Sequence, residues 1–146
     1  MFSPLTQNMI EQYDYPIVTE DTLDAFTGRH DSVVLFFTED AKKFPETDDV
    51  AMILPELVKA FGGRFQAAVV ARPDQYKLQR RYAFREWPTL VFLRAGEYLG
   101  AISRVQDWHD YLEQIEQILA AEPGQAPDAM LSVPAQVIAG PVTTRK

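Results

Sequence analysis

The chain of 146 residues contains no cysteine. Disulfide bonds, thiol redox chemistry, cysteine nucleophiles and thiolate metal sites are therefore excluded. The sequence also lacks a run of about 20 apolar residues, the length that crosses a bilayer as a helix, so we expect no membrane insertion. Residues 1–4 do not open a basic stretch followed by an apolar one, so no export signal is visible and we expect a cytoplasmic protein.

Basic side chains are the scarcer charge, with 14 lysines and arginines against 21 aspartates and glutamates. The net charge of −7 disfavours nucleic acid and anionic membranes as partners and favours a basic partner. Solubility alone is the alternative reason for such a charge. With 47% hydrophobic residues the chain can bury a core by itself, and we expect neither a cofactor nor a metal.

Apolar periodicity predicts strands that alternate with helices. Residues 32–37 are apolar on both faces, as in the central strand of a helix-covered sheet. Pro55 lies inside the next helix and should kink it. The expected elements are a helix from Ser3-Pro4, a strand at 15–18, a helix at 20–26 capped by Thr19, strands at 32–37 and 65–71 around a helix ending at Gly62-Gly63, a helix from Pro73-Asp74, a hairpin of 87–93 with 98–102, and a helix at 108–121 capped by Asp107.

We expect the rest of the chain to be arranged around residues 87–93. Pro88 lacks the N–H that a central strand needs, so it belongs at the first residue of its strand. An aromatic residue before proline raises the cis fraction, and we predict a cis bond between Trp87 and Pro88. Trp87 is either a core residue or, at the mouth of a strand, a partly exposed anchor for a partner. We favour the anchor.

The stretch from Glu39 to Glu56 is acidic, with six acidic and two basic side chains. We interpret it as a surface that attracts a basic partner, because complementary charge steers association. The alternative is a solvated loop in which Asp48 or Asp49 caps the next helix. Residues 72–85 have the opposite balance, but the acidic overall charge argues against nucleic acid as their ligand.

The order of these elements resembles the thioredoxin fold over residues 16–121. The fold class is then α/β, with a central mixed β-sheet flanked by helices. The Cys-x-x-Cys motif of thioredoxins is missing from the corresponding stretch, residues 38–49. A narrower resemblance is to the thioredoxin-like hydrogenase expression and formation proteins, the HyaE/HupG type of nickel–iron hydrogenase operons. The matching residues are Val33-Val34-Leu35, Asp40-Ala41-Lys42-Lys43-Phe44-Pro45-Glu46, Pro55-Glu56-Leu57, Trp87-Pro88-Thr89-Leu90-Val91-Phe92, Gly96-Glu97-Tyr98-Leu99-Gly100 and Trp108.

This resemblance implies a non-enzymatic chaperone. Its partner would be the hydrogenase small-subunit precursor, including the twin-arginine export signal, with other maturation proteins as further partners. We expect an N-terminal helix in residues 1–15, a thioredoxin-like domain in 16–121 and a proline-rich, flexible tail in 122–146. The partner-binding residues that we predict are Glu39, Asp40, Glu46, Asp48, Asp49, Trp87 and Pro88.

Two other functions stay open from the residues alone. In the first, Glu39, Asp40 or Glu46 acts as part of an acid–base pair on a small molecule. In the second, the chain is a structural adaptor in a maturation complex. A nucleophile–base arrangement is not indicated, because His30 and His109 are distant in sequence and no cysteine exists.

Overall fold

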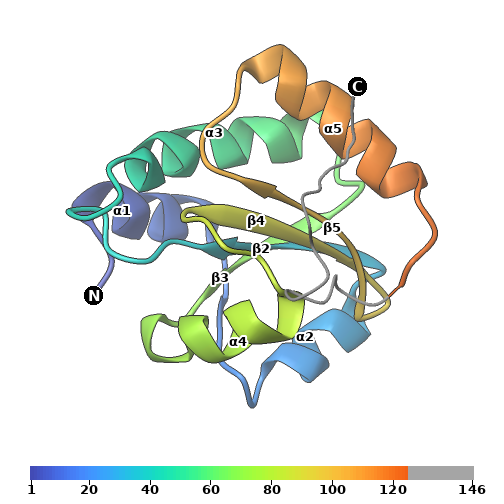
Figure 1. The fold of residues 1–146 in the computed structure, drawn as a ribbon, viewed down its shortest axis with the longest axis horizontal. Coiled ribbons are helices and arrows are strands. Elements are labelled where there is room, and N and C mark those ends of the chain that lie inside the picture. The colour runs from blue at the N-terminus through green and yellow to red at the C-terminus, as the bar shows by residue number, and fades with distance from the viewer. Residues whose placement is uncertain (125–146) are drawn as a thin grey trace.

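The computed structural model describes residues 1–124 and folds them around one five-stranded mixed sheet between two helical layers (Figure 1). The strand order is β1-β3-β2-β4-β5, which places β2 in the centre. β3 runs parallel to β1 and β2, whereas β4 is antiparallel to both β2 and β5. The predicted central mixed sheet is thereby confirmed. The strands are β1 Ile17–Val18, β2 Ser32–Phe37, β3 Gln66–Val70, β4 Thr89–Arg94 and β5 Glu97–Ser103.

The helices cover the two faces of this sheet unequally. α1, α3 and α5 lie on one face and α2 and α4 on the other (Figure 1). The helices are α1 Pro4–Tyr13, α2 Leu23–Arg29, α3 Glu46–Ala60, α4 Gln75–Tyr82 and α5 Trp108–Ala120, with a single 3₁₀ turn at Arg72–Asp74 before α4.

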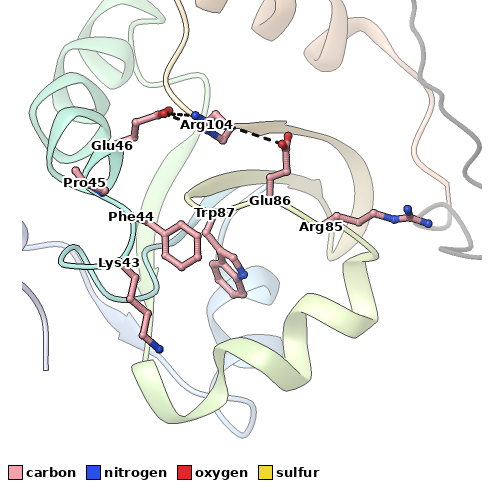
Figure 2. Close-up of a pocket in the computed structure, with 8 residues that line it drawn as sticks. All are labelled: Lys43, Phe44, Pro45, Glu46, Arg85, Glu86, Trp87 and Arg104. Atoms are coloured by element: carbon pink, nitrogen blue, oxygen red, sulfur yellow. Dashed lines mark hydrogen bonds and ion pairs between the residues drawn. The ribbon is translucent and has the colours of Figure 1, made fainter.

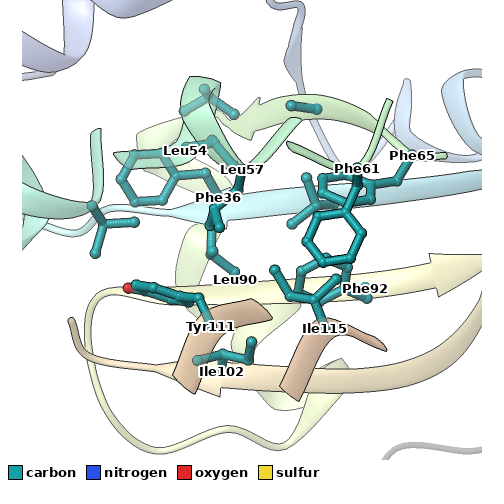
Figure 3. Close-up of a cluster of buried hydrophobic side chains, with 14 of the residues drawn as sticks. Phe36, Leu54, Leu57, Phe61, Phe65, Leu90, Phe92, Ile102, Tyr111 and Ile115 are labelled. Carbon is teal, nitrogen blue, oxygen red and sulfur yellow. The ribbon is translucent and has the colours of Figure 1, made fainter. Parts of the chain in front are cut away.

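β2 is buried along its whole length, which is why its sequence is apolar at every position after Ser32. Its alternate side chains enter two separate cores. Val34 and Phe36 face α3 and α5, in the core drawn in Figure 3. Val33, Leu35 and Phe37 enter the core beneath α2 and α4.

Two predicted helix starts are wrong. Thr19 does not cap α2, because it forms a turn with Thr22, whose N–H donates to the Thr19 hydroxyl at 3.1 Å, and the helix begins only at Leu23. α3 begins at Glu46, so Asp48 and Asp49 lie inside its first turn and neither is its N-cap.

The N-terminal helix begins as predicted. Ser3 caps α1, its hydroxyl accepting the N–H of Thr6 at 3.1 Å, and Pro4 occupies the first helical position. Met9 and Ile10 of α1 are buried in the same core as α3. At the other end the N–H of Gly124 donates to the carbonyl of Tyr98 at 2.8 Å, and the predicted flexibility of the tail beyond this point concerns residues outside those described.

Candidate functional site

A pocket lies where the N-terminus of α3 meets the loop that precedes β4 (Figure 2). We call it the α3 pocket. Its volume is about 420 Å³. In Figure 2 the ring of Phe44 lies next to the indole of Trp87, and Arg104 stands between two carboxylates. The lining residues are Lys43, Phe44, Pro45, Glu46, Arg85, Glu86, Trp87 and Arg104.

A tight turn between β2 and α3 brings Phe44 to this pocket. The carbonyl of Asp40 accepts the N–H of Lys43 at 3.0 Å and that of Phe44 at 2.9 Å. The Asp40 side chain accepts the N–H of Lys42 at 2.9 Å. Aspartate favours such turns, because its side chain can bond the backbone two residues further on. Phe44 and Pro45 are thereby fixed at the start of α3.

Trp87 is buried, with only 6% of its surface exposed, so the partial exposure that we predicted is wrong. The centroid of its ring lies 5.0 Å from that of Phe84, 6.3 Å from Phe37 and 5.3 Å from Tyr76. A large ring gains more by packing among other aromatic rings than by facing water. Trp87 therefore forms part of the pocket wall and does not project from it.

The main chain at Trp87 makes no hydrogen bond in the described part of the chain. Pro88 is buried, its bond to Trp87 is cis, and its carbonyl accepts the N–H of Arg104 at 2.7 Å. Within residues 1–124, however, neither the N–H nor the C=O of Trp87 makes a hydrogen bond. A main-chain donor and acceptor without partners in the wall of a pocket can pair with an extended segment.

The rim of the pocket consists of paired charges. Arg104 bonds the Glu46 carboxylate with two of its nitrogens and lies 3.9 Å from Glu86. The N–H of Val105 donates to the other Glu46 oxygen at 2.7 Å. The Arg104 hydrogen bond, followed by that of Val105, lowers the pKa of Glu46 from its ordinary value of 4.5. Glu46 is therefore held as an anion that already has its partners.

Glu39 was predicted to contact a partner, but only 5% of it is exposed. One carboxylate oxygen accepts the guanidinium of Arg72 at 3.1 Å, and the other accepts the hydroxyl of Tyr76. The bond to Glu39 is the main reason why the pKa of Tyr76 is raised. The main-chain N–H of Glu39 donates to the Gln75 side chain at 2.7 Å. The chain turns at Glu39, whose φ is 49°, two residues after the end of β2, and this turn places its side chain inside.

The predicted carboxylates do not form one surface. Of the five acids, only Glu46 lines the α3 pocket. Asp48 accepts the hydroxyl of Ser3 at 2.5 Å, and Asp49 is exposed on α3. Asp40 is half-buried in its own turn. The structure thus brings Glu46 and Trp87 together and leaves the other acids outside the pocket.

Several residues that line the pocket were not among the partner-binding residues predicted from the sequence. Phe44, Pro45 and Glu86 adjoin predicted residues, and an apolar pair directly before a helix was a usable signal. Arg104 is 58 residues from its partner Glu46, and no local pattern indicates that pair. Tyr76 was also missed. Its surface is 52% exposed, and its ring lies beside that of Trp87.

The acidic side chains at and near this site are dispersed over the described residues. Residues 1–124 contain no cluster of three histidine or acidic side chains that could hold a metal ion. Glu39 is bonded to Arg72 and Glu46 to Arg104, so the two carboxylates are held by different arginines and are not bonded to each other. Among the described helices, none is both long and apolar enough to span a bilayer.

Comparison with known proteins identifies the family. The family model described as hydrogenase-1 expression protein HyaE matches residues 5–111. The chain is 48% identical to the hydrogenase expression/formation protein HoxO of Azotobacter vinelandii, over 84% of this chain and 82% of the relative. It is 43% identical to HupG of Bradyrhizobium diazoefficiens, over 72% and 74% of the two chains.

Solved structures agree with this result. A hydrogenase expression/formation protein hupG from Rhodopseudomonas palustris aligns with a TM-score of 0.51 and 42% identity, covering 72% of this chain and 95% of that one. A thioredoxin from Halobacterium salinarum aligns with a TM-score of 0.58 at 21% identity, covering 75% and 96%, which establishes the thioredoxin-like fold. The chain therefore belongs to the HyaE family of hydrogenase expression/formation proteins and carries a thioredoxin-like fold without any cysteine.

Proposed function

We propose that this protein is a redox-inactive, non-enzymatic chaperone of nickel–iron hydrogenase maturation. It acts in the cytoplasm and binds the hydrogenase small-subunit precursor, including its twin-arginine signal peptide, before export. The signal lies in an extended conformation across the α3 pocket. Other maturation proteins bind elsewhere on the chain.

The observation that carries this proposal is the α3 pocket, with the unpaired main-chain N–H and C=O of Trp87 in its wall. An extended segment can pair with that N–H and C=O while one of its side chains enters the pocket between Phe44 and the charged rim. The pocket volume of about 420 Å³ is sufficient for one large side chain. A site of this kind binds peptide without needing a thiol.

The charge distribution supports a basic partner at long range. The net charge of −7 attracts a basic segment and raises its rate of association. Glu86, which lines the pocket, and Asp49, in the first turn of α3, are exposed carboxylates. Such charges steer and orient a partner more than they add affinity.

An acid–base enzyme is the other function that the sequence left open, and no specific observation favours it. A general acid at neutral pH needs a raised carboxyl pKa. The one pocket carboxyl with a clear shift, Glu46, has its pKa lowered by Arg104. We therefore do not put this function forward.

Calorimetric titration with the purified small-subunit precursor, with and without its signal peptide, tests the proposal. We expect binding of the complete precursor and a loss of at least tenfold in affinity when the signal is removed. Phe44→Glu should reduce binding by a similar factor, because it places a charge in the apolar wall. Leu5→Glu on α1 is the matched control, since Leu5 is exposed and outside the pocket.

Two results contradict the proposal at different levels. If the wild-type protein does not bind the complete precursor, the proposed function is wrong. If Phe44→Glu folds normally and binds as tightly as the wild type, the function stands but the site lies elsewhere.

A further inference from the structure

The carboxylates predicted to hold a basic partner are already engaged within the protein. Four of the five, all except Asp49, accept a hydrogen bond from another group of the chain. A guanidinium from a partner that bonds both oxygens of such a carboxylate would compete with those existing bonds, which reduces the net gain. Asp49 does not line the α3 pocket. The pocket itself thus offers no free carboxylate pair to a twin-arginine motif.

The charges that line the pocket also argue against binding of the arginine pair. Three of its side chains are basic, Lys43, Arg85 and Arg104, and two are acidic, Glu46 and Glu86. Lys43 forms no ion pair with any residue in the described part of the chain. Two adjacent guanidinium groups would therefore meet the ammonium group of Lys43 at short range, whatever the net charge of the molecule does at long range.

What the site does offer is aromatic surface. Phe44 and Trp87 line the pocket, and the ring of Tyr76 lies 5.3 Å from that of Trp87. Tyr76 is 52% exposed, so its ring is accessible at the surface. Its hydroxyl is bound by the buried carboxylate of Glu39, which Arg72 holds in turn. A ring that is positioned before binding loses little conformational entropy when a ligand packs on it.

We propose that the part of the signal held at this site is its apolar stretch, and that the arginine pair is not held there. Export signals carry an apolar region of about 7–15 residues after their basic region. An apolar side chain enters the pocket against Phe44 and Trp87, and the next one on the same side of the extended segment packs on Tyr76. Glu39 is the positioning residue for Tyr76. This inference rests on the proposed function and specifies which part of the signal is recognised.

Titrations of three full-length precursors with the purified protein, at physiological salt, test this inference. The precursors carry the native signal, a signal with both arginines replaced by glutamine, and a signal with two apolar residues replaced by serine. We expect less than a threefold loss of affinity for the glutamine signal. For the serine signal the loss should reach about thirtyfold, the factor that corresponds to a binding hot spot.

Protein variants complete the experiment. Tyr76→Ala should weaken binding of the native signal about thirtyfold and have little further effect on the serine signal, because both changes remove the same contact. Trp108→Ala is the matched control, since Trp108 is 45% exposed on α5, on the opposite face of the sheet. Thermal melting of Tyr76→Ala checks that the fold is intact.

The outcomes separate the two proposals. If the glutamine signal loses most of its affinity while the serine signal binds normally, the arginine pair is what the protein holds and the inference is overturned. If Tyr76→Ala and the serine signal weaken binding independently, Tyr76 does not contact the apolar stretch and the inference is again wrong. If the wild-type protein binds none of the precursors, the proposed function itself fails.

Discussion

The inner wall of the site and its rim use similar residues for different purposes. In the interior, Glu39 behind the pocket wall and Trp87 in it are 5% and 6% exposed and hold the fold together. At the rim, the Glu46 side chain is 27% exposed and Arg104 is exposed, so both meet solvent and any ligand. Sequence treats Glu39 and Glu46 as equivalent acids of one loop. The two acids differ in burial, and the substitutions below test whether they also differ in their contribution to stability.

The largest effect should come from Trp87→Ala. Removing a buried indole that packs on three aromatic rings should cost about 3–5 kcal/mol of the free energy of unfolding. Urea denaturation measures this loss. Trp108→Ala, which changes the exposed tryptophan, should cost far less and serves as the control. A loss for Trp87→Ala as small as that of the control would show that Trp87 is not part of the core.

Glu39→Ala should have the next largest effect. The change leaves Arg72 and the Tyr76 hydroxyl without their shared acceptor, which should lower the free energy of unfolding by about 2 kcal/mol. The same urea titration measures it, together with an absorbance titration of the tyrosines. Because the bond to Glu39 raises the pKa of Tyr76, that pKa should fall in the variant. Unchanged stability and an unchanged tyrosine titration would place Glu39 at the rim.

Glu46→Gln should have the smallest effect, below about 1 kcal/mol, because the ion pair that it breaks is at the surface. The pH dependence is specific. The pKa of Glu46 is lower in the folded state than in the unfolded state, where it is 4.5. The contribution of Glu46 to the free energy of unfolding is therefore complete above pH 4.5 and is lost as the pH falls through the folded-state pKa. Stability curves of wild type and variant should therefore differ at neutral pH and converge in acid. A difference that grows in acid would contradict this account.

Most of the fold could be predicted because its signals are local. The all-apolar run of β2, the helical spacing in α3 and α5, and the turn before β5 each follow from a few adjacent residues. The positive φ of Gly96 at that turn is an example, since glycine adopts it without strain. Helix starts were less predictable, because a threonine or aspartate can bond a neighbouring turn as well as a helix end.

The site could be predicted only in part. The position of Pro88 before β4 follows from its missing N–H, but the burial of Trp87 depends on Phe37, Phe84 and Tyr76, which arrive from other elements. The bond between Glu46 and Arg104 likewise depends on tertiary structure. Local charge counts overestimated the acidic surface, because they cannot tell which carboxylates the fold uses itself.

The most direct test of the central claim is a photocrosslinking experiment with the full-length protein and the complete small-subunit precursor. A benzophenone amino acid is placed at Phe44 in the pocket, and at Leu5 on α1 as a control. We predict that the pocket position crosslinks to the signal peptide of the precursor, as read by mass spectrometry, and that the control position does not. A precursor that crosslinks equally at both positions, or only at Leu5, would contradict the claim that the α3 pocket holds the signal.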